Sequence, residues 1–359
     1  MAESATPTTF KSELVQEIKL PSAVLDADLD ETRLYAACLD RGCYEIDLES
    51  SKFEKIGAHE SYASGAKLKP GVLITSGYDG TILWHDLRNR RVSHRVQAHR
   101  FWSWQLALSP DGRRVASVTG QYLAGGEKYE PAPETEPSVR LYDASNGKEL
   151  GAFSHHPPVL SVAFSPDSHH VAAANMMGEI RVWETASGRE QARWTTPDFT
   201  SWGMIKSHHY VGGIFGLAFA PNGSEVLACG MGPMRDPMAG NGKQTWQKFA
   251  WRENPPRKTG EIADQDRGNG LMECLAFHPS GRWFAMAGRL AQGKWNVALF
   301  DAMTGALAHS LDAKMRVTRA LFNRSGDRLM LCGAVGQEKK KNEKLPFGRI
   351  KIYRLDQAS

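Results

Sequence analysis

The residues with the clearest potential for chemistry are histidines that occur next to one another. Three such pairs lie along the chain, His155-His156, His169-His170 and His208-His209. Neutral imidazoles bind metal ions, but neighbouring side chains on a strand point to opposite faces. Each pair therefore presents one ring to any one face, and we predict no metal site and no cofactor.

A second group combines a histidine, a hydroxyl, a carboxylate and an indole within a short stretch. His59 is followed by Thr75 or Ser76, then by Asp79 in a tight turn, and then by Trp84. Their donors and acceptors are complementary, so these groups can satisfy one another away from water. We predict a buried structural network of His59, Thr75, Asp79 and Trp84 rather than a catalytic triad.

Carboxylates and thiols give no second indication of chemistry. No pair among the 40 Asp and Glu residues stands out as an acid and a base in separate environments. The five cysteines are an odd number, and none forms a Cys-x-x-Cys pair; they are Cys38, Cys43, Cys229, Cys274 and Cys332. This pattern favours reduced thiols in the core over a disulfide framework or a zinc site.

The elements that must position these residues repeat along the chain. An apolar alternating run leads into a tight turn, and the best preserved turns are Pro110-Asp111-Gly112, Pro166-Asp167-Ser168, Pro221-Asn222-Gly223 and Pro279-Ser280-Gly281. Proline presets φ near −65°, and Asp, Asn and Gly supply the remaining turn geometry. Each copy is therefore a reversal between two strands.

A third run of each copy alternates apolar and polar residues and ends near an aromatic. The seven runs are 44–47, 82–86, 139–143, 180–184, 246–251, 297–301 and 350–354. Alternation with period two is typical of strands with one face more buried than the other. A unit that cannot bury its own apolar face must stack on copies of itself.

These repeats resemble the WD40 family of β-propellers over nearly the whole chain. The aromatic-acidic pair of that family is best kept at Trp84-His85-Asp86, Tyr142-Asp143, Trp183-Glu184 and Phe300-Asp301. The resemblance implies an all-β fold, a seven-bladed propeller of four-stranded antiparallel blades. The last unit supplies three strands, so we expect an N-terminal strand at residues 10–20 to complete it and close the ring.

We expect one domain, residues 10–357, after a mobile tail at residues 1–9. The expected blades are residues 21–57, 58–97, 98–154, 155–195, 211–262, 270–311 and 315–355.

The chain start lacks a signal-peptide pattern, and no run approaches the ~18 apolar residues of a membrane span. We therefore predict a cytoplasmic protein without a membrane partner. The net charge of +4 is well short of a nucleic-acid-binding pattern, so we expect no nucleic-acid partner.

Where the repeats differ is informative about function. The connection into the first strand of a blade and the loop between its second and third strands open on the same rim, which we call the top rim. Long insertions fall at these positions, at residues 121–137, 195–210, 231–243 and 333–348. Insertions on one face of a repeat array mark its binding face.

Aromatic residues and two arginines occur at the same positions. The candidate binding residues of the top rim are Tyr62, Phe101, Trp102, Trp104, Trp202, Tyr210, Arg316 and Arg319. Rigid aromatic side chains are common anchors of protein interfaces, and arginines near the channel mouth suit anion contact. The sequence therefore favours a non-catalytic scaffold that docks a protein or peptide partner, alone or in a larger complex, and it identifies no small-molecule substrate.

Two alternatives remain at this stage. A propeller enzyme would need polar residues where the inner strands begin, and the starts expected there are Tyr62, Trp102, Val159, Phe215, Met272 and Val317. This series disfavours a hydrolytic or metal-dependent site in the channel. A reader of methylated or other cationic peptides would need an aromatic cage, with Tyr62, Trp102, Trp104 and Trp202 as its walls.

Overall fold

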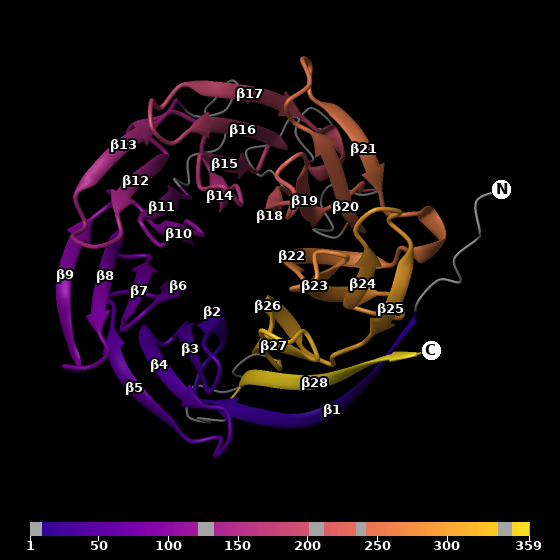
Figure 1. Ribbon diagram of the computed structural model, residues 1–359, viewed down its shortest axis with the longest axis horizontal. Helices are drawn as coiled ribbons and strands as arrows, with labels where there is room; N and C mark the ends of the chain where they lie inside the picture. Colours follow the sequence, from indigo (N-terminus) through magenta and orange to yellow (C-terminus); the bar gives the residue numbers. More distant parts are fainter. Residues whose placement is uncertain (1–8, 121–132, 201–211, 235–241, 337–346, 359) are drawn as a thin grey trace.

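The computed structural model describes residues 9–120, 133–200, 212–234, 242–336 and 347–358, and the regular secondary structure of this part is almost entirely β-strand (Figure 1). Its helical segments are two single 3-10 turns, η1 (Pro197–Phe199) and η2 (Asp264–Asp266). Across the described ranges, no helix has the length and apolar character to cross a membrane. The predicted all-β fold class is confirmed.

The strands form antiparallel groups of four, which we call blades and number along the chain. Blade 1 contains β2 (Val24–Leu29), β3 (Arg33–Cys38), β4 (Gly42–Asp47) and β5 (Phe53–Ala58). Blade 2 contains β6 (Ala63–Lys69), β7 (Val72–Gly77), β8 (Thr81–Asp86) and β9 (Arg91–Gln97). Blade 3 contains β10 (Ser103–Leu108), β11 (Arg114–Thr119), β12 (Val139–Asp143) and β13 (Glu149–Phe153). Blade 4 contains β14 (Val159–Phe164), β15 (His170–Asn175), β16 (Glu179–Glu184) and β17 (Glu190–Thr195).

The remaining strands form three more blades. Blade 5 contains β18 (Ile214–Phe219), β19 (Val226–Met231), β20 (Gly242–Ala250) and β21 (Arg257–Glu261). Blade 6 contains β22 (Asn269–Phe277), β23 (Trp283–Gln292), β24 (Val297–Asp301) and β25 (Leu307–Leu311). Blade 7 contains β26 (Arg316–Phe322), β27 (Arg328–Ala334), β28 (Gly348–Ala358) and β1 (Thr9–Leu20).

The blades are arranged around a central axis, with the first strand of each blade innermost (Figure 1). Blades 5 and 6 share one eight-stranded sheet, because Gly242 and Lys243 at the start of β20 pair with β22. In blade 7 the outermost strand is β1, which pairs with β28 from Thr9↔Ala358 to Leu20↔Gly348. The N-terminal strand therefore completes the sheet formed by the end of the chain. The division of the chain into a tail and one domain stays a prediction.

The apolar core is divided among the interfaces between neighbouring blades. Successive side chains of a strand point to opposite faces of its blade, and each face packs against one neighbouring blade. A separate cluster of buried side chains fills each interface between blades. Between blades 7 and 1, for example, Ile18 and Ile352 pack with Val24 and Leu34. Burial of these faces is the main stabilising contribution, at about 25 cal/mol per Å² of apolar surface.

As far as the structure describes the chain, the inner strands of neighbouring blades do not pair with one another in a β-ladder. Polar side chains link them instead. Thr318 Oγ1 of blade 7 donates to the carbonyl of Val24 in blade 1 over 2.8 Å. Equivalent links join Ser64 Oγ to the carbonyl of Ser103, Val162 N to Oε1 of Gln105, and Ser161 Oγ to the carbonyl of Ile214. Unpaired backbone groups at the inner edges thus gain partners.

Every inner strand carries a β-bulge near its start. The register shifts lie between Val24 and Asp26, Ala63 and Gly65, Ser103 and Gln105, Val159 and Ser161, Ile214 and Gly216, Met272 and Cys274, and Val317 and Arg319. A bulge re-aims the extra side chain. The extra residues are Leu25, Ser64, Trp104, Leu160, Phe215, Glu273 and Thr318, and all of them line the central cavity.

The five cysteines lie inside this framework. All are buried and unpaired. Burial raises the pKa of the Cys43 and Cys274 thiols to about 12, so both stay protonated near neutral pH.

Candidate functional site

Five aromatic side chains from blades 2 and 3 meet on the top rim, and we call them the rim cluster. They are Tyr62, Tyr78, Phe101, Trp102 and Trp104. The ring centroids of Tyr78 and Trp102 are 4.7 Å apart with an interplanar angle of 11°. Trp104 lies 5.6 Å from Tyr78, Phe101 lies 4.6 Å from Trp102, and Tyr62 lies 5.6 Å from Tyr78. Tyr62 is 44% exposed.

The rim cluster is positioned by strand ends that share one rim. Tyr62 directly precedes β6, and Tyr78 directly follows β7; their strands pair as Ala63↔Gly77. The bulge in β10 turns Trp104 toward the cavity, and its indole lies over Gly120, where an added Cβ would come within 2.7 Å of the ring. The absence of a side chain at Gly120 therefore leaves room for the indole.

The structure brings together four of the predicted rim residues, Tyr62, Phe101, Trp102 and Trp104. Trp202 and Tyr210 lie outside the described residues. Sequence reasoning missed Tyr78, which contacts three members of the cluster. Its position was the available signal, because it begins the loop between the second and third strands, which opens on the top rim. Burial raises the pKa of Tyr78 to about 12, so its hydroxyl is neutral.

The rings of the rim cluster stack rather than surround a space. Trp102 stacks on both Tyr78 and Phe101, at 11° and 25°. An aromatic cage needs ring faces that enclose a cation, whereas stacked rings cover one another's faces. Among the described residues, this geometry favours a continuous contact surface over a cage.

The predicted hydrogen-bond network is present in blade 2, with one change in membership. The Oγ1 of Thr75 lies 2.9 Å from Nε2 of His59 and 2.9 Å from Nε2 of His85. On its other side, Nδ1 of His59 lies 3.2 Å from both carboxylate oxygens of Asp79 and 3.1 Å from Oγ1 of Thr81. Burial alone would raise the pKa of Asp79, but hydrogen bonds from His59 and Thr81 hold it well below its usual range. The His59 side chain is fully buried, as a structural role requires.

The predicted place of Trp84 in this network is wrong. Trp84 donates its indole N–H to the carbonyl of Ala144 in blade 3 over 3.0 Å and packs in the interface between blades 2 and 3. Trp84 and His85 are neighbours on β8, so they point to opposite faces and only one of them can reach Thr75. His85 takes that position, and burial lowers its pKa to about 4.

Both predicted arginines line the central cavity, but their partners differ. Arg316 makes two contacts of 2.7 Å with the carboxylate of Glu273. Arg319 lies deeper along the same strand, and its Nε is 3.4 Å from Oδ1 of Asp26. Arg316 is therefore occupied by a bidentate carboxylate, whereas Arg319 has a single longer ion pair.

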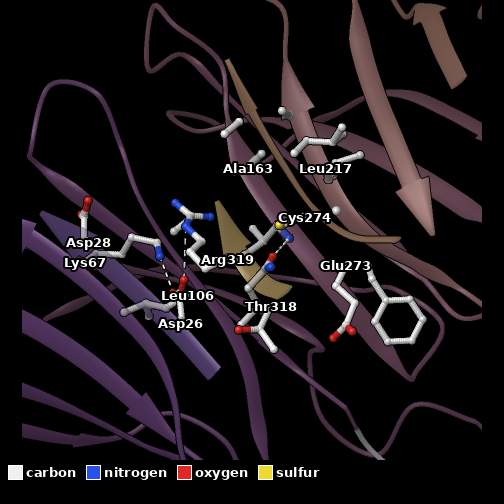
Figure 2. Close-up of a pocket in the computed structure, with 18 of the residues that line it drawn as sticks. Asp26, Asp28, Lys67, Leu106, Ala163, Leu217, Glu273, Cys274, Thr318 and Arg319 are labelled. Carbon is white, nitrogen blue, oxygen red and sulfur yellow. Dashed lines mark hydrogen bonds and ion pairs between the residues drawn. The ribbon is translucent and has the colours of Figure 1, made fainter. Parts of the chain in front are cut away.

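The expectation that the inner strands begin with mostly apolar residues needs correction. The bulges shift the cavity-lining position, so Glu273 and Thr318 take the places expected for Met272 and Val317. Deeper in the cavity lies a charged group formed by Asp26, Asp28, Lys67 and Arg319, from blades 1, 2 and 7 (Figure 2). Its residues lie within the inner strands rather than at their starts. Because each strand has a bulge before them, the alternation of the sequence does not indicate which of their side chains face the cavity.

A comparison with family models identifies one of the repeats directly. Residues 147–184 match the WD domain, G-beta repeat. This match covers the outer strand of blade 3 and the first three strands of blade 4, the unit that recurs along the chain. Residues 147–184 are a WD40 repeat. This repeat is thus offset by one strand from the blades of the structure.

Curated relatives agree with this assignment at low identity. The chain is 24% identical over 161 residues to the target of rapamycin complex subunit wat1 of Schizosaccharomyces pombe, and the match covers 44% of this chain and 42% of that one. It is 23% identical over 141 residues to human WD repeat and HMG-box DNA-binding protein 1, 39% of this chain and 11% of that one. It is 32% identical over 73 residues to human serine-threonine kinase receptor-associated protein, 20% of this chain and 19% of that one. The matched part spans less than half the length of these relatives.

Proposed function

We propose that this protein is a non-catalytic interaction scaffold that docks a protein or peptide partner on its top rim. The observation that carries the proposal is the rim cluster, a contiguous aromatic surface with Tyr62 exposed at its edge. Aromatic side chains bury large areas at low conformational cost, which is why they dominate binding energy at protein interfaces.

The names of two relatives support a scaffold function. One is a subunit of the target of rapamycin complex, and another is a kinase receptor-associated protein. Both descriptions fit proteins that act through other proteins. We extend only this general property to the chain, because the matches cover short parts of those relatives. A cytoplasmic location stays a prediction, and the buried, unpaired cysteines support it.

Paired substitutions test the docking surface. The variant Tyr62→Ala/Trp102→Ala removes the exposed edge and the stacked centre of the rim cluster, while Phe53→Ala removes an exposed aromatic on the outer strand of blade 1. Each protein serves as bait in its native cell extract, and bound proteins are identified by mass spectrometry. We expect partners shared by wild type and Phe53→Ala to be lost from the double variant.

The same experiment includes its own check on folding. Circular dichroism and the thermal midpoint of the double variant must match those of Phe53→Ala for the loss to report on binding. Capture of the same partners by the folded double variant would refute docking at the rim cluster. Should the double variant not fold, Tyr62→Ala alone, which changes a residue that is 44% exposed, carries the test.

A further inference from the structure

The central channel of the ring contains a cavity of about 650 Å³, and Tyr78 and Trp104 of the rim cluster line part of it. The inner strands of all seven blades contribute to its wall, including β2, β6, β14, β18 and β26. Sites for small molecules measure about 300–1,000 Å³. The cavity therefore has the size of a small-molecule site.

One side of the cavity is charged. Lys67 Nζ contacts Oδ2 of Asp26 and donates to the carbonyl of Ala66, and Arg319 approaches Oδ1 of Asp26 (Figure 2). Asp28 lies on the same strand as Asp26, two residues further on. Burial alone would lower the pKa of Arg319, but Asp26 and Asp28 raise it overall. Arg319 is therefore a permanent cation in the channel.

The two carboxylates of this group already have donors from the fold. Asp26 accepts hydrogen bonds from the backbone N–H of Ala66 and from Lys67, and Asp28 accepts from the backbone N–H of Leu68 over 2.9 Å. Because both carboxylates are used to link blades 1 and 2, they have little capacity left for a ligand.

Arg319, in contrast to the two carboxylates, lacks hydrogen-bond partners among the described residues. Its guanidinium donates no hydrogen bond to any of them, because Nε meets Oδ1 of Asp26 only as an ion pair over 3.4 Å. Of its side chain, 26% remains exposed. A guanidinium carries five N–H donors. The unmet requirement of the cavity is thus an acceptor that faces the two Nη atoms of Arg319.

The opposite side of the cavity is apolar. It is formed by inner-strand residues of blades 4, 5 and 6, namely Leu160, Val162, Phe215, Leu217 and Leu275. Figure 2 shows Ala163 and Leu217 on that side, away from the charged group. A ligand that fills the cavity must therefore present an acceptor at one end and an apolar body at the other.

We propose that the channel binds a small monocarboxylate with an apolar body, and that Arg319 holds its carboxylate through the two Nη groups. A planar carboxylate matches the guanidinium fork. A phosphate dianion fits less well, because Asp26 and Asp28 stand beside Arg319 and would repel the second charge. The carboxylate can belong to a free acid or to the C-terminus of a partner peptide. Tyr78 and Trp104 of the rim cluster also line the cavity, whereas Arg319 does not belong to the rim cluster.

Calorimetric titration of the full chain tests the site with two pairs of probes. One pair is 4-phenylbutyrate and its uncharged amide, and the other is the peptide acetyl-Gly-Leu-Phe with a free or an amidated C-terminus. We expect at least one acid to bind about tenfold more tightly than its amide, because the uncharged amide cannot form the charge-assisted hydrogen bonds to Arg319. The first pair reports a free acid and the second a peptide terminus.

Variants assign the effect to Arg319. We expect Arg319→Gln to remove the preference for the acid, and Arg319→Lys, which keeps a cation beside Asp26, to weaken it because the fork is lost. The control Arg324→Gln changes an exposed arginine of the same blade and should bind as wild type does. Ala163→Trp should abolish binding by filling the cavity from the apolar side.

Two results would overturn the proposal. One is equal binding of acid and amide, or no binding, for both probe pairs on the wild-type protein. The other is unchanged acid preference in a folded Arg319→Lys protein, which stands as the deciding variant if Arg319→Gln does not fold.

Discussion

At the residue scale, buried histidines make the stability of the protein depend on pH. Burial lowers the pKa of His85 to about 4, and that of His99 and His155 to about 3. These rings are neutral in the folded protein, whereas in the unfolded chain each titrates near its ordinary pKa of about 6.5. Between those values the unfolded chain binds more protons, so acid favours unfolding.

We therefore predict that the free energy of unfolding is highest above pH 6.5 and falls between pH 7 and pH 5. The linkage relation gives a loss of about 2 kcal/mol for His85 at pH 5. Urea denaturation at pH 7 and pH 5 measures the total loss of unfolding free energy. This total loss should be about 2 kcal/mol smaller in His85→Gln than in wild type, and unchanged in His94→Gln, which alters an exposed histidine. An equal loss in His85→Gln and wild type would contradict the assignment. Asp79 does not interfere, because its contribution is lost only at more acidic pH.

The sequence indicates which residue types form the hydrogen-bond network of blade 2, but it indicates only in part which side chains point toward one another. His59, Thr75 and Asp79 were assigned correctly, because histidine, hydroxyl and carboxylate occur at spacings that a single blade brings together. Trp84 was misplaced by one residue, and on a strand one residue reverses the face. The resemblance to a Trp-Asp pair favoured Trp84, while the geometry gives the position to His85.

At the element scale, β1 combines buried and exposed side chains on one outer strand. Ile18 packs between blades 7 and 1, whereas Leu14 is 44% exposed on the same strand. We predict that Ile18→Ala lowers the free energy of unfolding by about 2–5 kcal/mol and Leu14→Ala by less than about 0.5 kcal/mol. Denaturant titration of both variants measures the difference. Equal losses would mean that β1 does not contribute to the interface core.

Strands and turns were predictable because alternation and Pro-Asp-Gly turns are local features of the sequence. The bulges in the inner strands were not, since a bulge depends on how a strand meets its partner and leaves no residue type of its own. The sequence therefore indicates Trp104 only by its aromatic character, and it does not distinguish Glu273 from its neighbour Met272 as the residue that lines the cavity.

At the scale of the whole molecule, closure depends on a sheet shared between the two ends of the chain. Consider a circular permutant that is opened between Glu49 and Ser50, with residues 1 and 359 joined by a Gly/Ser linker. We predict that its two new chain ends again share one sheet. Its new N-terminal strand β5 would pair with β4 at the new C-terminus. A permutant opened between Lys314 and Met315 would separate two blades without a shared sheet and should unfold at lower urea concentration. Identical urea midpoints would show that strand sharing adds nothing to closure.

The register of that shared sheet also determines how the molecule responds to tension. Thr9 and Ala358 face each other across the ladder between β1 and β28, so the outer ends of the two strands lie side by side. A pulling force applied at these residues acts across the ladder and breaks its hydrogen bonds one pair after another, instead of shearing them together. We therefore expect the ring to be mechanically weak along the line between its ends, and blade 7 to lose β1 under load before blades 1 to 6 unfold.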